Sequence, residues 1–162
     1  MISNVRKVNR YFIISMLIPS LVMLASFVLF FALLYTNFTP SEGVAIGKYT
    51  VAAIISGVVV VLCTALLFVI NAKKYELVKE FGIERGRAVV IDSLSSGAGM
   101  AAVVISVFYT LITSSAALAS ADGTATSQAL FIPVFVVALV FMPSLLPSFL
   151  TQRKIKVALT KR

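Results

Sequence analysis

The chain has 162 residues, of which 60% are hydrophobic and 12% are charged, and its net charge is +8. A soluble domain is about 45–50% apolar and about 25% charged, so this apolar excess is too large for one small core and predicts a lipid environment. With no histidine and a single cysteine, Cys63, the sequence excludes an intrachain disulfide and argues against haem, copper or zinc sites. We therefore expect one transmembrane domain over residues 1–162, with no metal and no cofactor.

The first predicted element is an apolar run, Tyr11–Thr36, which is preceded by the basic residues Arg6, Lys7 and Arg10. About 20 residues are needed to cross a bilayer as a helix, whereas the apolar part of a cleaved signal peptide has about 7–15. The run therefore predicts a first membrane span that is retained. The connection that follows it, Asn37–Lys48, is too short to fold as an outer domain.

The second predicted span is Tyr49–Ala72. Helices in lipid associate by close packing and by interhelical hydrogen bonds, so small and polar residues mark their contact faces. Such residues recur in this span at helical spacing, together with two larger apolar ones: Ala53, Gly57, Val60, Thr64, Leu67 and Asn71. We expect this face to pack against the third span.

A polar segment, residues 73–90, joins the second and third spans and is predicted to be a cytoplasmic loop. Its five basic residues are Lys73, Lys74, Lys79, Arg85 and Arg87. Because Leu77, Val78 and Phe81 form a compact apolar face, we expect a short amphipathic helix that continues from the second span and turns at Gly82 and Gly86. Such a helix is suited either to lying on anionic lipid headgroups or to presenting its apolar face to a cytoplasmic protein.

The third predicted span covers roughly Ile91–Ser120. Small and hydroxyl residues form a stripe along it at steps of three and four: Ser95, Gly99, Ala102, Ser106, Tyr109, Thr113 and Ala116. We expect the stripe to pack against the second span, and a hydrated pathway along it is the alternative. Tyr109 is expected to hydrogen-bond a neighbouring helix, since an unpaired buried hydroxyl costs about 1–3 kcal/mol. The larger residues Val104, Val107, Leu111 and Leu118 are expected to face lipid.

Asp92 stands at the start of the third span and is the one acidic residue within the predicted spans. Serines follow it at positions 93, 95 and 96, so we expect Asp92 to cap the third helix. The alternative is an ion-coupling site, because transporters driven by protons or sodium carry ionisable groups inside the bilayer.

The fourth predicted span, Ala129–Leu150, contains Pro133, Pro143 and Pro147, which predict kinks. Of the 14 basic residues, three lie in the N-terminal tail, five in the segment 73–90 and five after the fourth span, which leaves only Lys48 elsewhere. The four apolar runs predict an all-α, four-helix transmembrane bundle in the cell membrane. The positive-inside rule predicts that both of its termini lie in the cytoplasm.

Residues 73–89, "KKYELVKEFGIERGRAV", resemble the cytoplasmic loop of ABC-transporter permeases of the cell-division and macrolide-export type. The positions that match the loop of that family are Leu77, Val78, Lys79, Phe81, Gly82 and Arg85. The stretch from Pro147 to Ala158 and Leu159 is also similar to the end of those permeases. Lys74 departs from the family, which has a glutamate there, and the large outer domain between the first two spans is missing. The resemblance implies that the loop is a coupling helix seated in a cytoplasmic ATPase, which another chain supplies.

The sequence shows neither paired carboxylates in a buried setting nor a glycine-rich phosphate loop, so an enzyme is not expected. No nucleic-acid partner is expected. We expect a non-catalytic subunit of a larger membrane complex, of the permease kind, with other membrane subunits, a second copy or a cytoplasmic ATPase as partners. The alternatives are a structural or assembly subunit of a membrane complex or coat, and a small channel or carrier that self-associates.

Overall fold

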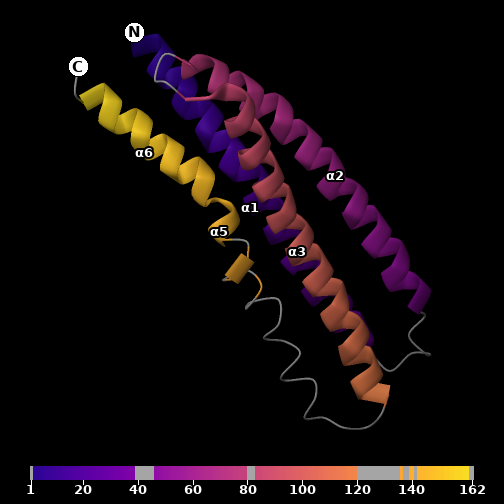
Figure 1. The fold of residues 1–162 in the computed structure, drawn as a ribbon. Coiled ribbons are helices and arrows are strands. Elements are labelled where there is room, and N and C mark those ends of the chain that lie inside the picture. Colours follow the sequence, from indigo (N-terminus) through magenta and orange to yellow (C-terminus); the bar gives the residue numbers. More distant parts are fainter. Residues whose placement is uncertain are drawn as a thin grey trace.

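The computed structural model describes residues 2–38, 46–79, 83–119, 136, 139–140 and 142–160. Regular structure in these residues is helical, without a β-strand. The helices are α1 (Ile2–Phe38), α2 (Ile46–Leu77), α3 (Arg85–Ala119), α5 (Met142–Ser144) and α6 (Leu146–Thr160), shown in Figure 1.

Three of the described helices are long and apolar enough to cross a membrane, over the stretches Arg6–Ala32, Val51–Leu77 and Arg85–Leu111. This confirms the membrane character predicted from composition. Residues 129–135, 137–138 and 141 of the predicted fourth span, Ala129–Leu150, lie outside the described residues, and its described end is divided between the short helix α5 and the start of α6. The four-span bundle therefore stays a prediction. Near the end of this predicted span, the helix is interrupted between α5 and α6. Helix α6 has Pro147 in its first turn, where the fixed backbone of proline is tolerated.

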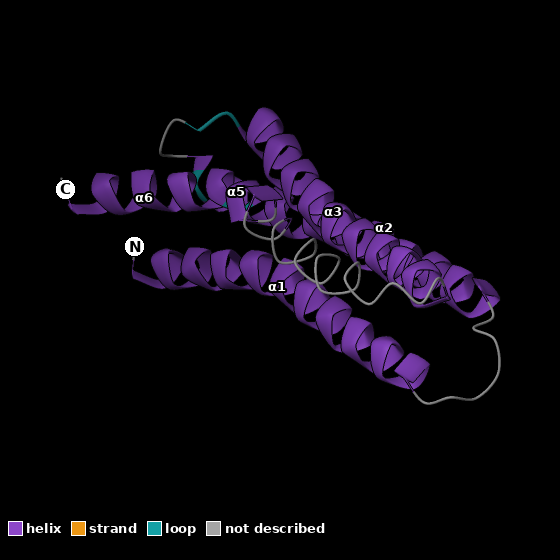
Figure 2. Cartoon of the chain, turned by 90° about the horizontal axis from the view of Figure 1, so that it is seen from below, coloured by secondary structure: helices purple, strands orange, loops and turns teal. Residues whose placement is uncertain are grey.

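The three long helices run alongside one another, with α2 and α3 antiparallel (Figure 1). The N-terminus, the connection between α2 and α3 and the C-terminal end of α6 all lie at the same end of the molecule (Figure 1). Figure 2 shows α6 beside the N-terminal part of α1, and Gln152 Nε2 lies 3.4 Å from Asn9 Oδ1 across that contact. The three segments that are rich in lysine and arginine are thus gathered at one end, which is called the basic end below.

Helix α3 forms the centre of the packing, because it contacts α1, α2, α5 and α6. Its Met100, Val103, Val107 and Leu111 are at most 1% exposed, and they pack with Phe30 of α1 and with residues of α2. The prediction that Val107 and Leu111 face lipid is therefore wrong, as it is for Val104, which is 7% exposed. A helix that is covered on two sides buries its bulky residues as well as its small ones.

Helices α2 and α3 approach each other closely at Gly97, whereas Gly57 has open space beside it. A Cβ atom added to Gly97 would lie 2.7 Å from Thr64 Oγ1 and 2.8 Å from Thr64 Cγ2, whereas nothing lies within 4 Å of a Cβ added to Gly57. Only glycine allows the two helices to approach this closely. Thr64 itself donates a hydrogen bond to Val60 O at 2.7 Å, so it adds no bond between the helices.

Most of the predicted loop 73–90 is helical. Its first five residues extend α2 as far as Leu77, and its last six open α3 at Arg85. Val78 and Tyr75 pack there against Val8 and Phe12 of α1 in a second apolar cluster. The basic end of the molecule is therefore a packed part of the fold.

Candidate functional site: a buried polar cluster at the basic end

A buried ion pair joins α2 to α3 at the basic end. Lys74 Nζ donates a hydrogen bond to Asp92 Oδ2, and the two side chains are 0% and 2% exposed. Lys74 extends the α2 face that carries Leu67 and Asn71, at steps of four and three residues, so it points toward α3. The packing of α2 on α3 therefore continues into a pair of opposite charges.

The ammonium group of Lys74 is enclosed by groups from four helices. Ser15 Oγ of α1 lies 3.5 Å from Lys74 Nζ, and Ser148 Oγ of α6 lies 3.2 Å from it. The rings of Phe12 and Tyr75 each lie with their centroid 4.7 Å from the same nitrogen, within the range of a cation–π interaction. A buried charge is tolerated when it is both paired and hydrogen-bonded, and Lys74 meets both conditions.

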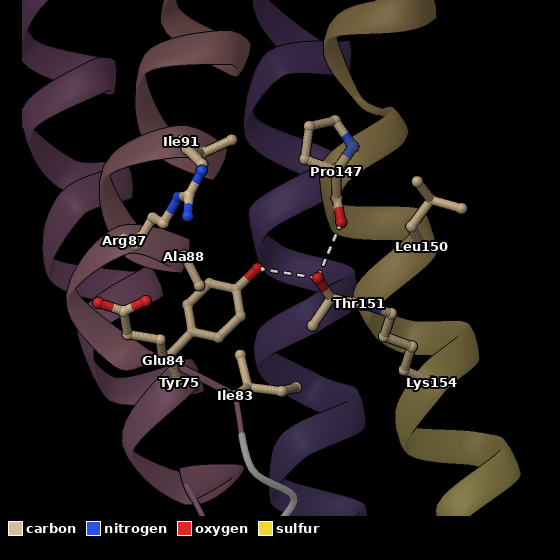
Figure 3. Close-up of a pocket in the computed structure, with 10 residues that line it drawn as sticks. All are labelled: Tyr75, Ile83, Glu84, Arg87, Ala88, Ile91, Pro147, Leu150, Thr151 and Lys154. Atoms are coloured by element: carbon tan, nitrogen blue, oxygen red, sulfur yellow. Dashed lines mark hydrogen bonds between the residues drawn. The ribbon is translucent and has the colours of Figure 1, made fainter.

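Tyr75 connects the ion pair to α6. Its hydroxyl donates a hydrogen bond to Asp92 Oδ2 at 3.0 Å and lies 3.4 Å from Thr151 Oγ1. Thr151 in turn donates to Pro147 O at 2.9 Å, and both Tyr75 and Thr151 are drawn in Figure 3. Because Asp92 accepts from Lys74 and from Tyr75, its carboxylate is the centre of the cluster.

Two further hydrogen bonds between helices surround the ion pair. Asn71 Nδ2 donates to Ser93 Oγ at 2.9 Å, and Ser95 Oγ donates to Ser144 O of α5 at 2.7 Å. Within the described part of the chain, Asn71 Oδ1 is buried without a hydrogen-bond partner. We call the group formed by Ser15, Asn71, Lys74, Tyr75, Asp92, Ser93, Ser148 and Thr151 the polar cluster.

A pocket of about 500 Å³ lies between α3 and α6, and Tyr75 forms part of its wall (Figure 3). Apolar residues such as Ile91 and Leu150 line it together with the charged side chains of Glu84, Arg87 and Lys154. The pocket therefore leads from a charged surface to the hydroxyl that contacts Asp92.

The structure divides the residues predicted to dock a partner. Val78 is 0% exposed and Leu77 is half-buried, because α1 covers the apolar face of the segment. The prediction that Val78 presents itself to a cytoplasmic protein is therefore wrong. Lys79 and Arg85 are exposed, and Arg85 lies 3.7 Å from Glu76 in a surface ion pair. The other two predicted docking residues, Phe81 and Gly82, lie outside the described residues.

The residues predicted to pack the third span have several different environments. Ser95 bonds to α5, Gly99 is buried and Ala102 is half-buried. Ser106 is buried, but it donates to Val103 O of its own helix at 2.8 Å and so joins no second helix. Tyr109 is 57% exposed, so its side chain lies on the outer surface of α3. The side chain of Thr113 lies outside the described residues.

The prediction that Asp92 caps the third helix is wrong. Helix α3 begins at Arg85, so Asp92 lies in its third turn, where the backbone amide groups are already bonded within the helix. The basic residues of the first turn are accommodated at the surface, and this lets the helix start two turns earlier than the apolar run does. Asp92 instead forms the buried pair with Lys74.

Charge counting places Lys74 among the five basic residues of a solvated loop, so it gives no sign that this lysine is buried. The signal that identifies it is the spacing of Leu67, Asn71 and Lys74, which puts the lysine on the contact face of α2.

Among the described residues, no group of three or more histidine, cysteine, aspartate or glutamate side chains could hold a metal ion. Comparisons of the chain with protein families, curated proteins and solved structures find no match.

Proposed function

We propose that the protein is a non-catalytic integral subunit of a membrane transport complex, and that its basic end docks a cytoplasmic partner at the connection between α2 and α3. The observation that carries this proposal is the polar cluster, which joins α1, α2, α3 and α6 at the end of the molecule that carries the exposed basic side chains. A partner that binds such an end meets a surface of fixed shape.

A buried ion pair is a poor device for stability alone. Taking two charges out of water costs several kcal/mol per ion, roughly what their attraction returns, and an apolar pair of similar volume often serves as well. An ion pair does discriminate between arrangements, because any helix shift that separates Lys74 from Asp92 leaves two buried charges without an opposite charge beside them. The role that fits is to fix how the helices are placed at this end.

The exposed side chains above the cluster are mostly cationic. Lys79 and Arg85 flank the connection between α2 and α3, and these two residues are called the turn surface. Complementary charges speed encounter and select partners, so the turn surface suits an acidic protein surface. The positive-inside rule supports placing this end, with both termini, on the cytoplasmic side of the cell membrane.

The resemblance to ABC-transporter permeases agrees with a partner at this position, namely an ATPase supplied by another chain. The burial of Val78 changes which side chains would contact that ATPase. Contact would run through the turn surface rather than through the apolar face of the segment.

Affinity purification of the tagged chain from its own membrane, with mass spectrometry of the proteins that accompany it, tests the proposal. The variant Lys79→Glu/Arg85→Glu reverses the turn surface, and Arg153→Glu/Lys154→Glu makes the same charge change on α6. A stoichiometric ATPase that is lost in the first variant and kept in the second supports docking at the turn surface. Membrane partners without an ATPase would favour the structural or assembly subunit and would refute the transport role.

One observation favours a second function, that of a self-associating channel or carrier. Ionisable groups inside membrane helices commonly mark ion pathways, and the pocket beside Tyr75 leads toward the Lys74–Asp92 pair. Purified protein in liposomes distinguishes the two functions. Selective ion movement by the protein alone, abolished by Asp92→Asn, would replace the subunit proposal with the carrier.

A further inference from the structure

A second pocket, of about 530 Å³, lies between α1 and α2 at the basic end. Its walls carry three basic side chains, one acidic side chain and an apolar and aromatic base: Lys7, Arg10, Tyr11, Ile14, Lys73, Glu76 and Leu77. We propose that this pocket binds the headgroup of an anionic phospholipid. The pocket is distinct from the polar cluster, because Lys73 is exposed on one side of α2 while Lys74 is buried on the other.

The charge of the pocket suits a phosphate group. Lys7 and Arg10 come from one helix and Lys73 from the other, so a bound anion would meet cations on both sides. Glu76 would repel an anion, but three basic side chains against one carboxylate leave the pocket with a net positive charge. The hydroxyl of Tyr11 is a neutral donor for a phosphate or glycerol oxygen.

The depth of the pocket matches the headgroup layer. The stretches Arg6–Ala32 and Val51–Leu77 each have 27 residues. At 1.5 Å per residue they are each about 40 Å long, close to the 40–45 Å or so of a bilayer that includes its headgroups. Lys7 and Arg10 lie at the beginning of the first stretch and Lys73 near the end of the second, which places all three at the level of lipid phosphates.

Apolar residues extend from the pocket along both helices toward the bilayer core. Leu17 follows Arg10 by seven residues, and Leu66 precedes Lys73 by seven, so each shares a helix face with its basic partner. Leu17 is 52% exposed and Leu66 is 50% exposed. A headgroup held by the basic residues would lay its acyl chains on this surface, and a free phosphate ion would gain nothing from it.

Native mass spectrometry of delipidated protein tests the site. Phosphatidylglycerol and phosphatidylcholine with identical acyl chains are added together, and the two bound populations are compared. The variant Arg10→Gln/Lys73→Gln removes two charges from the pocket, and Arg153→Gln/Lys154→Gln removes two from α6 as a matched control. Each lost charge should weaken binding of the anionic lipid about 5-fold, or about 25-fold for the pair, while the control keeps its affinity.

Three results would overturn the proposal: equal binding of the two lipids, equal loss in the pocket variant and the α6 control, or displacement of phosphatidylglycerol by inorganic phosphate at the same concentration. The last would identify a site for free anions rather than for lipid. The charge-conserving variant Arg10→Lys/Lys73→Arg should keep the preference, so a loss there would also contradict a site that recognises charge.

Discussion

Removing either partner of the Lys74–Asp92 pair should cost far more stability than removing both. In Lys74→Met the Asp92 carboxylate stays buried, and of its two hydrogen bonds in the cluster only the one from Tyr75 remains. In Asp92→Asn the Lys74 ammonium stays buried, but it keeps the two serine hydroxyls and the two aromatic rings. We expect Lys74→Met to be the more damaging of the two.

The expected magnitude follows from the burial of both groups. With side chains 0% and 2% exposed, solvent screens neither charge, and breaking such a pair costs about 3–5 kcal/mol in the free energy of unfolding. The double variant Lys74→Met/Asp92→Asn leaves no buried charge, so its cost should be limited to the desolvation of the new amide at position 92 opposite the new methionine at position 74, about 1–3 kcal/mol relative to the wild type, and well below the sum of the two single variants. The neighbouring variant Lys73→Met is the control, since its side chain is exposed and should change stability by less than about 0.5 kcal/mol.

Unfolding in mixed detergent micelles can be followed through the one thiol of the chain, because Cys63 is half-buried on α2 and becomes reactive when the helices separate. The wild type, the two single variants and the double variant Lys74→Met/Asp92→Asn then give a double-mutant cycle. A coupling energy near zero, or single variants as stable as Lys73→Met, would refute the conclusion that the pair fastens the basic end.

Five other variants test the packing. Gly97→Ala places a methyl group against Thr64 and should destabilise the protein by about 1–3 kcal/mol. Gly57→Ala fills open space in a helix and should stabilise the protein slightly. Equal melting temperatures of the two variants would contradict the close approach at Gly97. Leu111→Ala should cost about 2–5 kcal/mol and Ile105→Ala, at a position 68% exposed, less than about 0.5 kcal/mol; the reverse order would mean that α3 faces the other way. Tyr75→Phe removes the hydroxyl between Asp92 and α6 and should lower the free energy of unfolding by about 1–3 kcal/mol. Proteolysis of α6 should then be faster. An unchanged cleavage rate would show that α6 is held by other contacts.

The sequence was informative where the pattern depends on one helix at a time. Long apolar runs predicted the three helices that can cross a membrane, and the α2 face through Val60, Leu67 and Asn71 is buried as its spacing indicates. The distribution of basic residues predicted that the two ends of the chain and the α2–α3 connection share one side, and the structure brings them to one end. Composition and helical spacing are local properties, so a single sequence records them.

Features that depend on a third helix could not be read in this way. Val107 and Leu111 were expected to face lipid because they lie beside the small-residue stripe, yet α1 covers that side of α3. Val78 was expected to face a partner, and α1 covers it as well. Lys74 was counted with the loop charges, since charge counting treats every lysine as solvated; its burial depends on Asp92, 18 residues away on the next helix.

Photocrosslinking in the native membrane tests the proposed docking most directly. A photoreactive residue is placed at Lys79 on the turn surface, and a matched one at Leu94, which is 54% exposed on α3 within a stretch that can cross the membrane. We expect position 79 to capture one cytoplasmic protein, an ATPase, and position 94 not to capture it. Capture of the same protein from position 94, or of only lipid and copies of this chain from position 79, would contradict docking at the turn surface.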